Sequence, residues 1–159
     1  MTLSRRKSYL KLSKGRTAIN IFDKEQEEFI EAKIAEVEKK TSAEVKVIVT
    51  NYCWGNLLQK AQKIFEKHNL HQTEKRNGVM ILLIVKNREL LIYGDKGINE
   101  AVGENFWVDT KDKMIEMFQG NLIAEGVVAG IEDIGAKLVE FFPVEKDDVN
   151  ELCNRVVYE

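Results

Sequence analysis

Two apolar runs joined by a short polar turn restrict the fold of this chain more than any other feature. The first run covers residues 79–85 and the second covers residues 90–93, with Lys86-Asn87-Arg88 between them and glycines on either side. Short apolar runs bounded by turn residues are typical of the two strands of a β-hairpin. The first run does not alternate with polar residues, so both faces of that strand are expected to be covered. The pattern therefore places this hairpin at the centre of an α/β domain.

A helix, a strand and a second helix are expected before the hairpin. Asp23 with Gln26 three positions later is a variant of the capping box, and apolar residues at helical spacing continue this helix to near Lys40. Residues 45–50 are mostly β-branched, as in a short strand. The second helix follows the turn at residues 54–56 and ends near residue 70. Two strands joined through a helix form a crossover unit, which predicts that they are parallel, while the hairpin strands are antiparallel.

The chain after the hairpin is expected to be helical. Residues 114–118 contain an apolar stripe, and a long, strongly periodic helix is expected over residues 123–142, ended by Pro143. Gly126 and Gly130, four positions apart, would let this long helix lie close to the sheet.

These elements define a fold class and the boundaries of the domain. The prediction is an α/β fold: a three-layer α/β/α sandwich whose short mixed central sheet combines the parallel crossover unit with the hairpin and is flanked by helices. We expect a basic flexible arm over residues 1–19, the α/β domain over residues 20–143 and a C-terminal peripheral helix over residues 144–159. Residues 1–16 contain six Lys or Arg and no acid, so deletion of the arm is not expected to unfold the domain.

The sequence also predicts a cytoplasmic protein without a transmembrane segment. The longest apolar run, residues 79–85, is far too short to span a bilayer, and the charged N-terminus lacks the apolar region of a signal peptide. Cys53 and Cys153 lie far apart in the sequence and not at metal-ligand spacing, which suggests a reducing compartment.

Charge is unevenly distributed along the chain, although the net charge is only −2. Residues 1–94 hold 18 Lys or Arg and 11 Asp or Glu, whereas residues 95–159 hold 6 and 15. A folded domain can mix both halves on one surface, as solvated charges usually do. The alternative is an acidic pocket built mostly from the second half, which would favour cations over phosphates.

The expected topology brings several oxygen-bearing side chains to one edge of the sheet. Glu44 lies at the start of the first strand, Asn77 at the start of the second and Asp95 at the end of the third, and Glu104 and Asp109 could fold back towards them. Oxygen ligands that converge from loops suit Ca²⁺, with Mg²⁺ as the other candidate. The sequence therefore predicts a divalent-metal site of these five residues. The simpler interpretation is that Glu44 and Asp95 are cap and turn residues.

Four segments resemble the TPM domain family, named after a thylakoid lumen protein, a photosystem II repair protein and a modulator of acetylcholine-receptor levels. They are Thr41 to Val49, Asn77 to Leu82, Arg88 to Gly94 and the glycine-bearing helix over residues 120–142. The resemblance implies an α/β sandwich with a short central sheet, binding of divalent metals and of calcium in particular in some members, and an acid phosphatase activity in plant members. Lys75 and Arg76 stand where members often have an acidic residue.

Two functions follow from these observations. The first is a soluble module that binds a divalent cation, expected to be calcium, at one edge of the sheet and acts as an accessory or regulatory protein through a protein partner, which could be membrane-associated. The alternative is a metal-dependent acid phosphatase acting on phosphate monoesters, for which Arg76 would supply the positive charge. Nucleic acid is not the expected partner, because the basic arm lacks interleaved aromatic residues and the pI is not basic.

Overall fold

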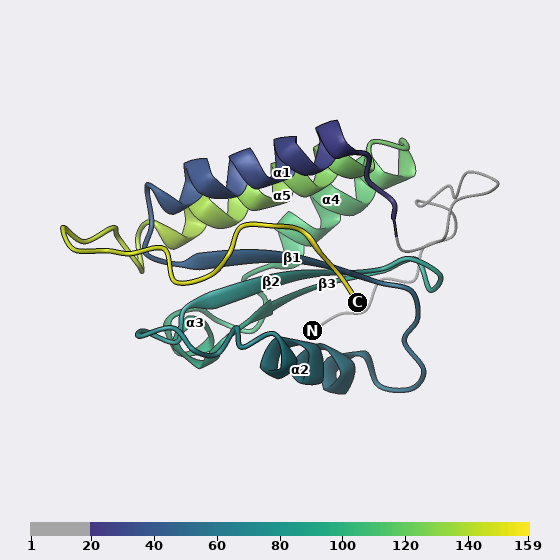
Figure 1. The fold of residues 1–159 in the computed structure, drawn as a ribbon. Coiled ribbons are helices and arrows are strands. Elements are labelled where there is room, and N and C mark those ends of the chain that lie inside the picture. Colours follow the sequence, from purple (N-terminus) through teal and green to yellow (C-terminus); the bar gives the residue numbers. More distant parts are fainter. Residues whose placement is uncertain (1–19) are drawn as a thin grey trace.

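The predicted hairpin forms one half of the sheet, with its second strand at the edge. The structure is a computed structural model, and it describes residues 20–159. Strand β2, Gly78–Ile84, is antiparallel to β3, Glu89–Gly94, and every residue of β2 is buried. The sheet has the order β3-β2-β1-β4, so β2 has a partner on each side (Figure 1). An apolar strand without alternation is thus covered from both faces, as predicted.

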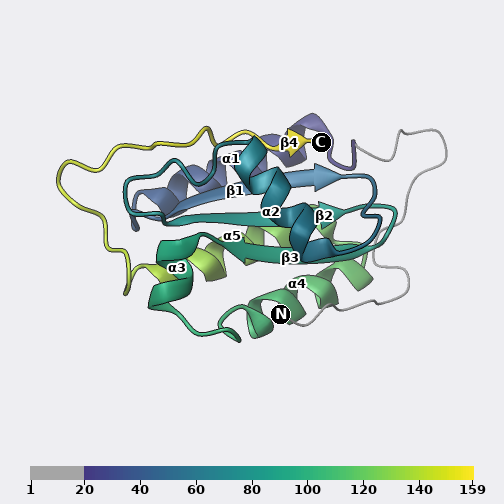
Figure 2. The same cartoon turned by 90° about the horizontal axis from the view of Figure 1, so that it is seen from below.

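The crossover unit is also confirmed. Strand β1, Glu44–Thr50, is parallel to β2 over its whole length, and α2, Leu57–Lys67, connects the two. On its other side β1 pairs in parallel with β4, Val157–Tyr158, which the sequence did not predict. Figure 2 shows the chain before β4 running along the outer side of β1.

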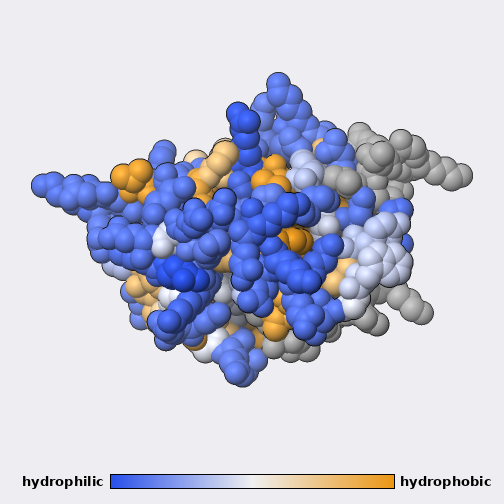
Figure 3. Space-filling model, turned by 60° about the horizontal axis from the view of Figure 1, so that its bottom comes forward, coloured by the Kyte–Doolittle hydropathy of each residue, from blue (hydrophilic) through white to orange (hydrophobic). Residues whose placement is uncertain are grey.

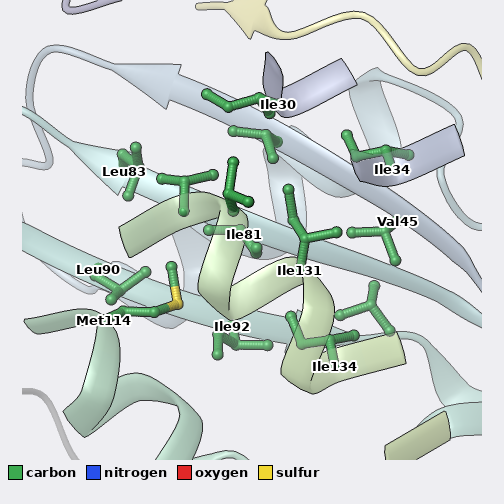
Figure 4. Close-up of a cluster of buried hydrophobic side chains, with 14 of the residues drawn as sticks. Ile30, Ile34, Val45, Ile81, Leu83, Leu90, Ile92, Met114, Ile131 and Ile134 are labelled. Atoms are coloured by element: carbon green, nitrogen blue, oxygen red, sulfur yellow. The ribbon is translucent and has the colours of Figure 1, made fainter. Parts of the chain in front are cut away.

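Helices cover both faces of the sheet and make the three predicted layers. Helices α1, Lys24–Glu38, α4, Val108–Gln119, and α5, Ile123–Leu138, lie on one face, and α2 lies on the other (Figure 1). The short α3, Lys96–Ala101, follows β3, and its buried residue Ile98 belongs to the same core as α1, α4 and α5. Alternate residues of β2 enter different cores. Ile81 and Leu83 pack with Ile131 of α5 (Figure 4), whereas Met80 and Leu82 belong to the core beneath α2. No helix in residues 20–159 combines the length and the apolar content needed to cross a bilayer.

The ends of the helices are partly as predicted. Asp23 and Gln26 form the capping box of α1, in which each side chain accepts a hydrogen bond from the backbone of the other at 2.9 and 3.0 Å. Helix α5 ends at Leu138, before the position at which Pro143 would end it. Residues 139–142 leave the helix, and the Phe142 carbonyl accepts hydrogen bonds from Thr41 and Ser42, which precede β1. The prediction for the basic arm, residues 1–19, lies outside the described residues.

The glycines of α5 allow close helix packing, but not against the sheet as predicted. The closest atoms to a Cβ placed at Gly126 or Gly130 belong to Phe118 and Met114 of α4. A third glycine, Gly135, faces α1, where an added methyl group would overlap the side chain of Val37. These glycines therefore fit α5 between α1 and α4.

The prediction of a C-terminal helix is wrong. Residues 144–159, called the C-terminal segment below, contain no helix and run along the edge of the sheet to β4. Asp and Asn residues in this segment have low helix propensity. Its backbone instead bonds to the domain: Val156 donates to the Glu31 carboxylate at 3.2 Å, Glu159 donates to the Val49 carbonyl at 2.7 Å, and the Cys153 carbonyl accepts from Lys46.

Glu38 lies at the junction between α1, β1 and the C-terminal segment. Its carboxylate accepts hydrogen bonds from the Val45 backbone N–H and from the Asn150 side-chain amide, both at 3.0 Å. Burial raises the pKa of Glu38 to about 8, the Val45 N–H opposes this, and the neighbouring Glu44 carboxylate raises the pKa further.

We predict that Gly135→Ala destabilises the protein although alanine favours helices. The gain in helix propensity is about 1 kcal/mol, but overpacking against Val37 costs about 1–3 kcal/mol. Urea denaturation should show a net loss for Gly135→Ala. Gly130→Ala is the matched control and should cost less, because the flexible Met114 side chain can move aside. Equal stabilisation by both substitutions would contradict close packing of α1 on α5.

We also predict that stability falls as pH rises from the ordinary Glu pKa of 4.5 to about 8, and that Glu38→Gln reduces this fall. Between the unfolded and folded pKa values the folded state binds more protons, so the unfolding free energy decreases with rising pH. The neutral amide introduced by Glu38→Gln removes this proton linkage, which should lessen the loss by on the order of 1–2 kcal/mol.

Melting curves recorded across this pH range would test the prediction. Glu36→Gln is the matched control, because Glu36 is exposed and its pKa is lowered by hydrogen bonds to Lys33 and Lys40, which affects stability only at more acidic pH. If Glu38→Gln and the parent protein lose stability in parallel, Glu38 is not the linked group.

Candidate functional site

The structure places three of the five predicted site residues at the same edge of the sheet. Glu44 is paired with Gly78 at the start of β1 and β2, and Val79 is paired with Gly94 at the end of β3. The backbone joins the three positions, since Glu44 N–H donates to the Asn77 carbonyl at 3.2 Å and Asp95 N–H donates to the Gly78 carbonyl at 2.9 Å. The side chains of Glu44, Asn77 and Asp95, however, have different surroundings.

Glu44 holds the C-terminal segment. It is 3% exposed, and its carboxylate accepts hydrogen bonds from the backbone N–H groups of Glu151 at 2.8 Å and Leu152 at 3.3 Å. Burial raises the pKa of Glu44; these two hydrogen bonds oppose the rise, and the charges of Glu151 and Asp148 add to it. Its oxygens are therefore already used to attach a segment that the sequence prediction placed in a helix.

Asp95 is paired with Arg76 and caps α3. Its two carboxylate oxygens accept from Nε and Nη2 of Arg76 at 2.7 and 2.9 Å, and Oδ1 also accepts from the backbone N–H of Lys96 at 2.7 Å. The start of α3 lies close to the backbone before β2, and this contact depends on Gly97, because a Cβ there would overlap the carbonyl oxygens of Lys75 and Arg76. The hydrogen bonds from Arg76 to Asp95 raise the pKa of the guanidinium. Asp95 thus fits the simpler interpretation of a cap residue with an ion-pair partner.

Glu104 and Asp109 do not join the other three side chains. Glu104 is an exposed residue between α3 and α4. Asp109 lies in the first turn of α4 and forms an ion pair with Lys137 of α5 at 2.6 Å, which lowers the pKa of Asp109. Within residues 20–159, no three His, Cys, Asp or Glu side chains are gathered closely enough to hold a metal ion. The predicted set of five is not assembled as a metal site.

Asn77 has the most unusual environment of the predicted residues. It is 1% exposed, its side-chain N–H donates to the Ser42 carbonyl at 2.9 Å, and its backbone N–H donates to Thr73 Oγ1 at 3.1 Å. Its side-chain oxygen Oδ1 is buried and has no hydrogen-bond partner among the described residues. A buried polar atom without a partner costs about 1–3 kcal/mol, so a ligand for it is favourable.

Asn77 lines a cavity of about 330 Å³ that we call the acidic pocket. Its other lining residues come from the loops before β1 and β2 and from the C-terminal segment: Ser42, Glu74, Lys75, Glu145, Asp147, Asp148, Val149 and Glu151. Lys75 forms an ion pair with Glu145, and the Glu151 carboxylate accepts from the backbone N–H of Glu74 at 3.1 Å. Five carboxyl groups face one lysine, so the pocket carries a negative charge.

The sequence prediction missed the carboxyl groups of this pocket. Four of them lie within residues 145–151, which were assigned to a peripheral helix away from the sheet. The signal that could have found them is the excess of acidic residues in the second half of the chain, from which an acidic pocket was one interpretation.

A second, larger cavity of about 620 Å³ lies between α2 and α3, and we call it the Arg76 cavity. Its lining combines charged, polar and aromatic residues: Gln62, Phe65, Glu66, His71, Arg76, Tyr93, Gly94, Asp95, Lys96, Asn99 and Glu100. The rings of Phe65 and Tyr93 are in tilted contact at 5.0 Å, and burial raises the pKa of Tyr93. Asp95 faces this cavity and Asn77 faces the acidic pocket, so the predicted edge is divided between two cavities.

Comparisons with known proteins agree with this architecture. A family model described as the TPM domain matches residues 17–137. The NMR structure of the BA42 protein from the psychrophilic bacterium Bizionia argentinensis is 33% identical, with a TM-score of 0.80, and the match covers 92% of this chain and 97% of that one.

A more distant structure shares the fold alone. The N-terminal domain of a protein from P. gingivalis is 18% identical, with a TM-score of 0.62 over 76% of this chain and 78% of that one. The search of curated proteins found no match. The family match over residues 17–137 and the likeness to BA42 show that this chain belongs to the TPM domain family.

Proposed function

We propose that this TPM-domain protein is an accessory module that binds a divalent cation, calcium by preference, in the acidic pocket and signals its bound state to a protein partner. The observation that carries the proposal is the environment of Asn77: this residue lines a pocket rich in carboxyl groups, and its buried Oδ1 has no partner within residues 20–159. An amide oxygen is a normal ligand for a hard cation, and a bound cation would remove the cost of leaving it unpaired.

The proposed ligands differ from the set predicted from the sequence. Asn77 is retained, whereas Asp147, Asp148 and Glu151 replace Glu44, Asp95, Glu104 and Asp109. The carboxyl groups of the C-terminal segment line the pocket without converging on one point, so the segment has to close on the cation. Calcium tolerates irregular coordination by six to eight oxygens, whereas magnesium requires near-ideal octahedral geometry. We therefore expect a calcium affinity in the range of about 10⁻⁴–10⁻³ M, since such flexible sites bind weakly.

Closure of the C-terminal segment gives the module something that a partner can detect. Asp147, Asp148 and Val149 are exposed at the surface, and Val149 is 70% exposed. A cation that draws the carboxyl groups inwards would change both the charge and the shape of this surface. A protein partner, including a membrane-associated one, could then bind one state more tightly than the other. The cytoplasmic location expected from the sequence remains a prediction.

We predict that calcium shifts the NMR signals of the Asn77 side-chain amide and of residues 145–151. The double variant Asp147→Asn, Asp148→Asn removes two charges from the pocket while keeping two oxygen ligands, so calcium affinity should fall by at least about tenfold. A titration of the ¹⁵N-labelled protein with Ca²⁺ and then Mg²⁺ would measure both effects.

The matched control is Asp109→Asn, which removes an acid of α4 that is paired with Lys137 and does not line the pocket. Its calcium affinity should equal that of the parent protein. Shifts concentrated at residues 95–97 would instead support the edge site predicted from the sequence, and shifts scattered over surface carboxyl groups would remove the basis for a specific site.

Phosphate monoester hydrolysis is the second candidate function, and the Arg76 cavity is the observation that favours it. The side chain of Arg76 is 48% exposed. Arg76, Lys96 and His71 bring nitrogen donors to this cavity, which is large enough for a small phosphate ester. Three carboxyl groups, those of Glu66, Asp95 and Glu100, line the same cavity and oppose a phosphate dianion. Arg76 is also held by Asp95, so a phosphate would have to compete for the guanidinium.

We therefore expect no hydrolysis of p-nitrophenyl phosphate above background, with or without Ca²⁺ or Mg²⁺. The assay should include Arg76→Ala and the matched substitution Lys113→Ala, because Lys113 is a cation on α4 outside the cavity. Metal-dependent turnover that a chelator abolishes, and that Arg76→Ala but not Lys113→Ala removes, would replace the accessory function with the phosphatase function.

A further inference from the structure

An exposed aromatic pair lies at the end of the sheet opposite the two cavities. Trp54 follows β1 and is 85% exposed, the largest exposed fraction of any large apolar side chain in residues 20–159. Its ring stacks on Tyr52 at 5.4 Å, and Tyr52 is itself 40% exposed. Leu58, in the first turn of α2, is 49% exposed. We call Tyr52, Trp54 and Leu58 the aromatic tip.

Hydrogen bonds hold the loop of the aromatic tip in place. The side-chain amide of Asn87, in the hairpin turn, both accepts from the Cys53 N–H at 3.2 Å and donates to the Cys53 carbonyl at 2.9 Å. Lys86 N–H donates to the Asn51 carbonyl at 2.9 Å, so the hairpin turn holds the loop at Asn51 and at Cys53. The tip is therefore ordered before any partner binds, and little conformational entropy is lost on binding.

The exposed charged side chains of the hairpin turn beside the aromatic tip are positive. The Lys86 ammonium lies 5.7 Å from the centre of the Tyr52 ring, and Arg88 is exposed in the same turn. The chain has no Asp or Glu between residues 45 and 65 or between residues 75 and 88. The acid nearest to the loop, Glu89, is only 5% exposed. The face that carries α2 is mainly hydrophilic with small apolar areas between the polar ones (Figure 3).

We propose that the aromatic tip docks on membranes that expose anionic lipid headgroups. Tryptophan and tyrosine settle at the headgroup level of a bilayer, where the ring is in an apolar environment and the polar group stays hydrated. Lys86, Arg88 and Lys60 supply the electrostatic attraction to anionic lipids. The loop enters the interface without any helix crossing the bilayer.

Charge and shape favour a lipid surface over the other occupants. A second copy of the chain, docked by the same patch, would bring Lys86 and Arg88 against their own counterparts. The aromatic tip contributes no residue to the acidic pocket or the Arg76 cavity, so it is a surface separate from both. An acidic protein surface is the remaining occupant, and the experiment separates it from lipid.

Tryptophan fluorescence can test the proposal directly, because the chain has two tryptophans and Trp107 is only 7% exposed. Trp107→Phe leaves Trp54 as the single reporter. With vesicles of phosphatidylcholine and phosphatidylserine, its emission should shift to shorter wavelength and be quenched by lipids brominated near the headgroup. Vesicles of phosphatidylcholine alone should give little shift, and added salt should weaken binding.

Co-sedimentation of the full chain with the same vesicles gives a second measurement that does not depend on Trp107→Phe folding. Trp54→Ala should lower the partition coefficient by at least about tenfold, and Lys86→Gln by about fivefold on anionic vesicles. The matched control is Phe29→Ala, which removes a 50% exposed aromatic side chain of α1. All variants retain the basic residues 1–16, so a loss is assigned to the substituted side chain.

Three outcomes would overturn the proposal. The first is no emission change and no sedimentation with anionic vesicles, which leaves an acidic protein surface as the occupant. The second is equal partition of Trp54→Ala and Phe29→Ala, which would assign binding to another part of the chain. The third is a shift of Trp54 emission that grows with protein concentration without lipid, which would identify a second copy as the partner.

Discussion

Complete burial of β2 is the constraint on which the rest of the structure depends. Its seven residues are apolar apart from Gly78 and lie between two strands, with one core above and another below. Such a strand is stable only if separate layers of helices exclude water from both faces. One layer is built from α1, α4 and α5 and the other from α2, and the chain has to cross the sheet edge to supply both.

The elements that were predicted from the sequence are those whose pattern is local. The hairpin and the capping box at Asp23 depend on residues close together in the sequence, and the crossover joins consecutive elements through α2; all three are present. The C-terminal segment could not be predicted in this way. Its conformation depends on carboxyl groups of Glu31 and Glu44, which lie more than a hundred positions away in the sequence and bind its backbone N–H groups.

The sequence predicted where the candidate site lies but not which side chains line it. Strand topology is sufficient to bring Glu44, Asn77 and Asp95 to one edge, because it fixes where strands start and end. Topology does not fix where a side chain points or what neutralises it. Asp95 turns to Arg76 on one side of the sheet, and Glu44 turns to the C-terminal segment. The acids of the pocket come from that same segment, so an error in one element became an error in the site.

The short pairing of β4 has a consequence for the outer edge of β1. Only Ile48 and Val49 of β1 have strand partners on the outer side, so the rest of β1 would otherwise present an open edge. The Glu38 carboxylate takes the Val45 N–H in place of a neighbouring strand. The Glu38 side chain, whose pKa is raised, and the coil of the C-terminal segment thus occupy positions along β1 that another β-strand would use. Detachment of the coil would expose the edge of β1 as a template for intermolecular β-sheet growth.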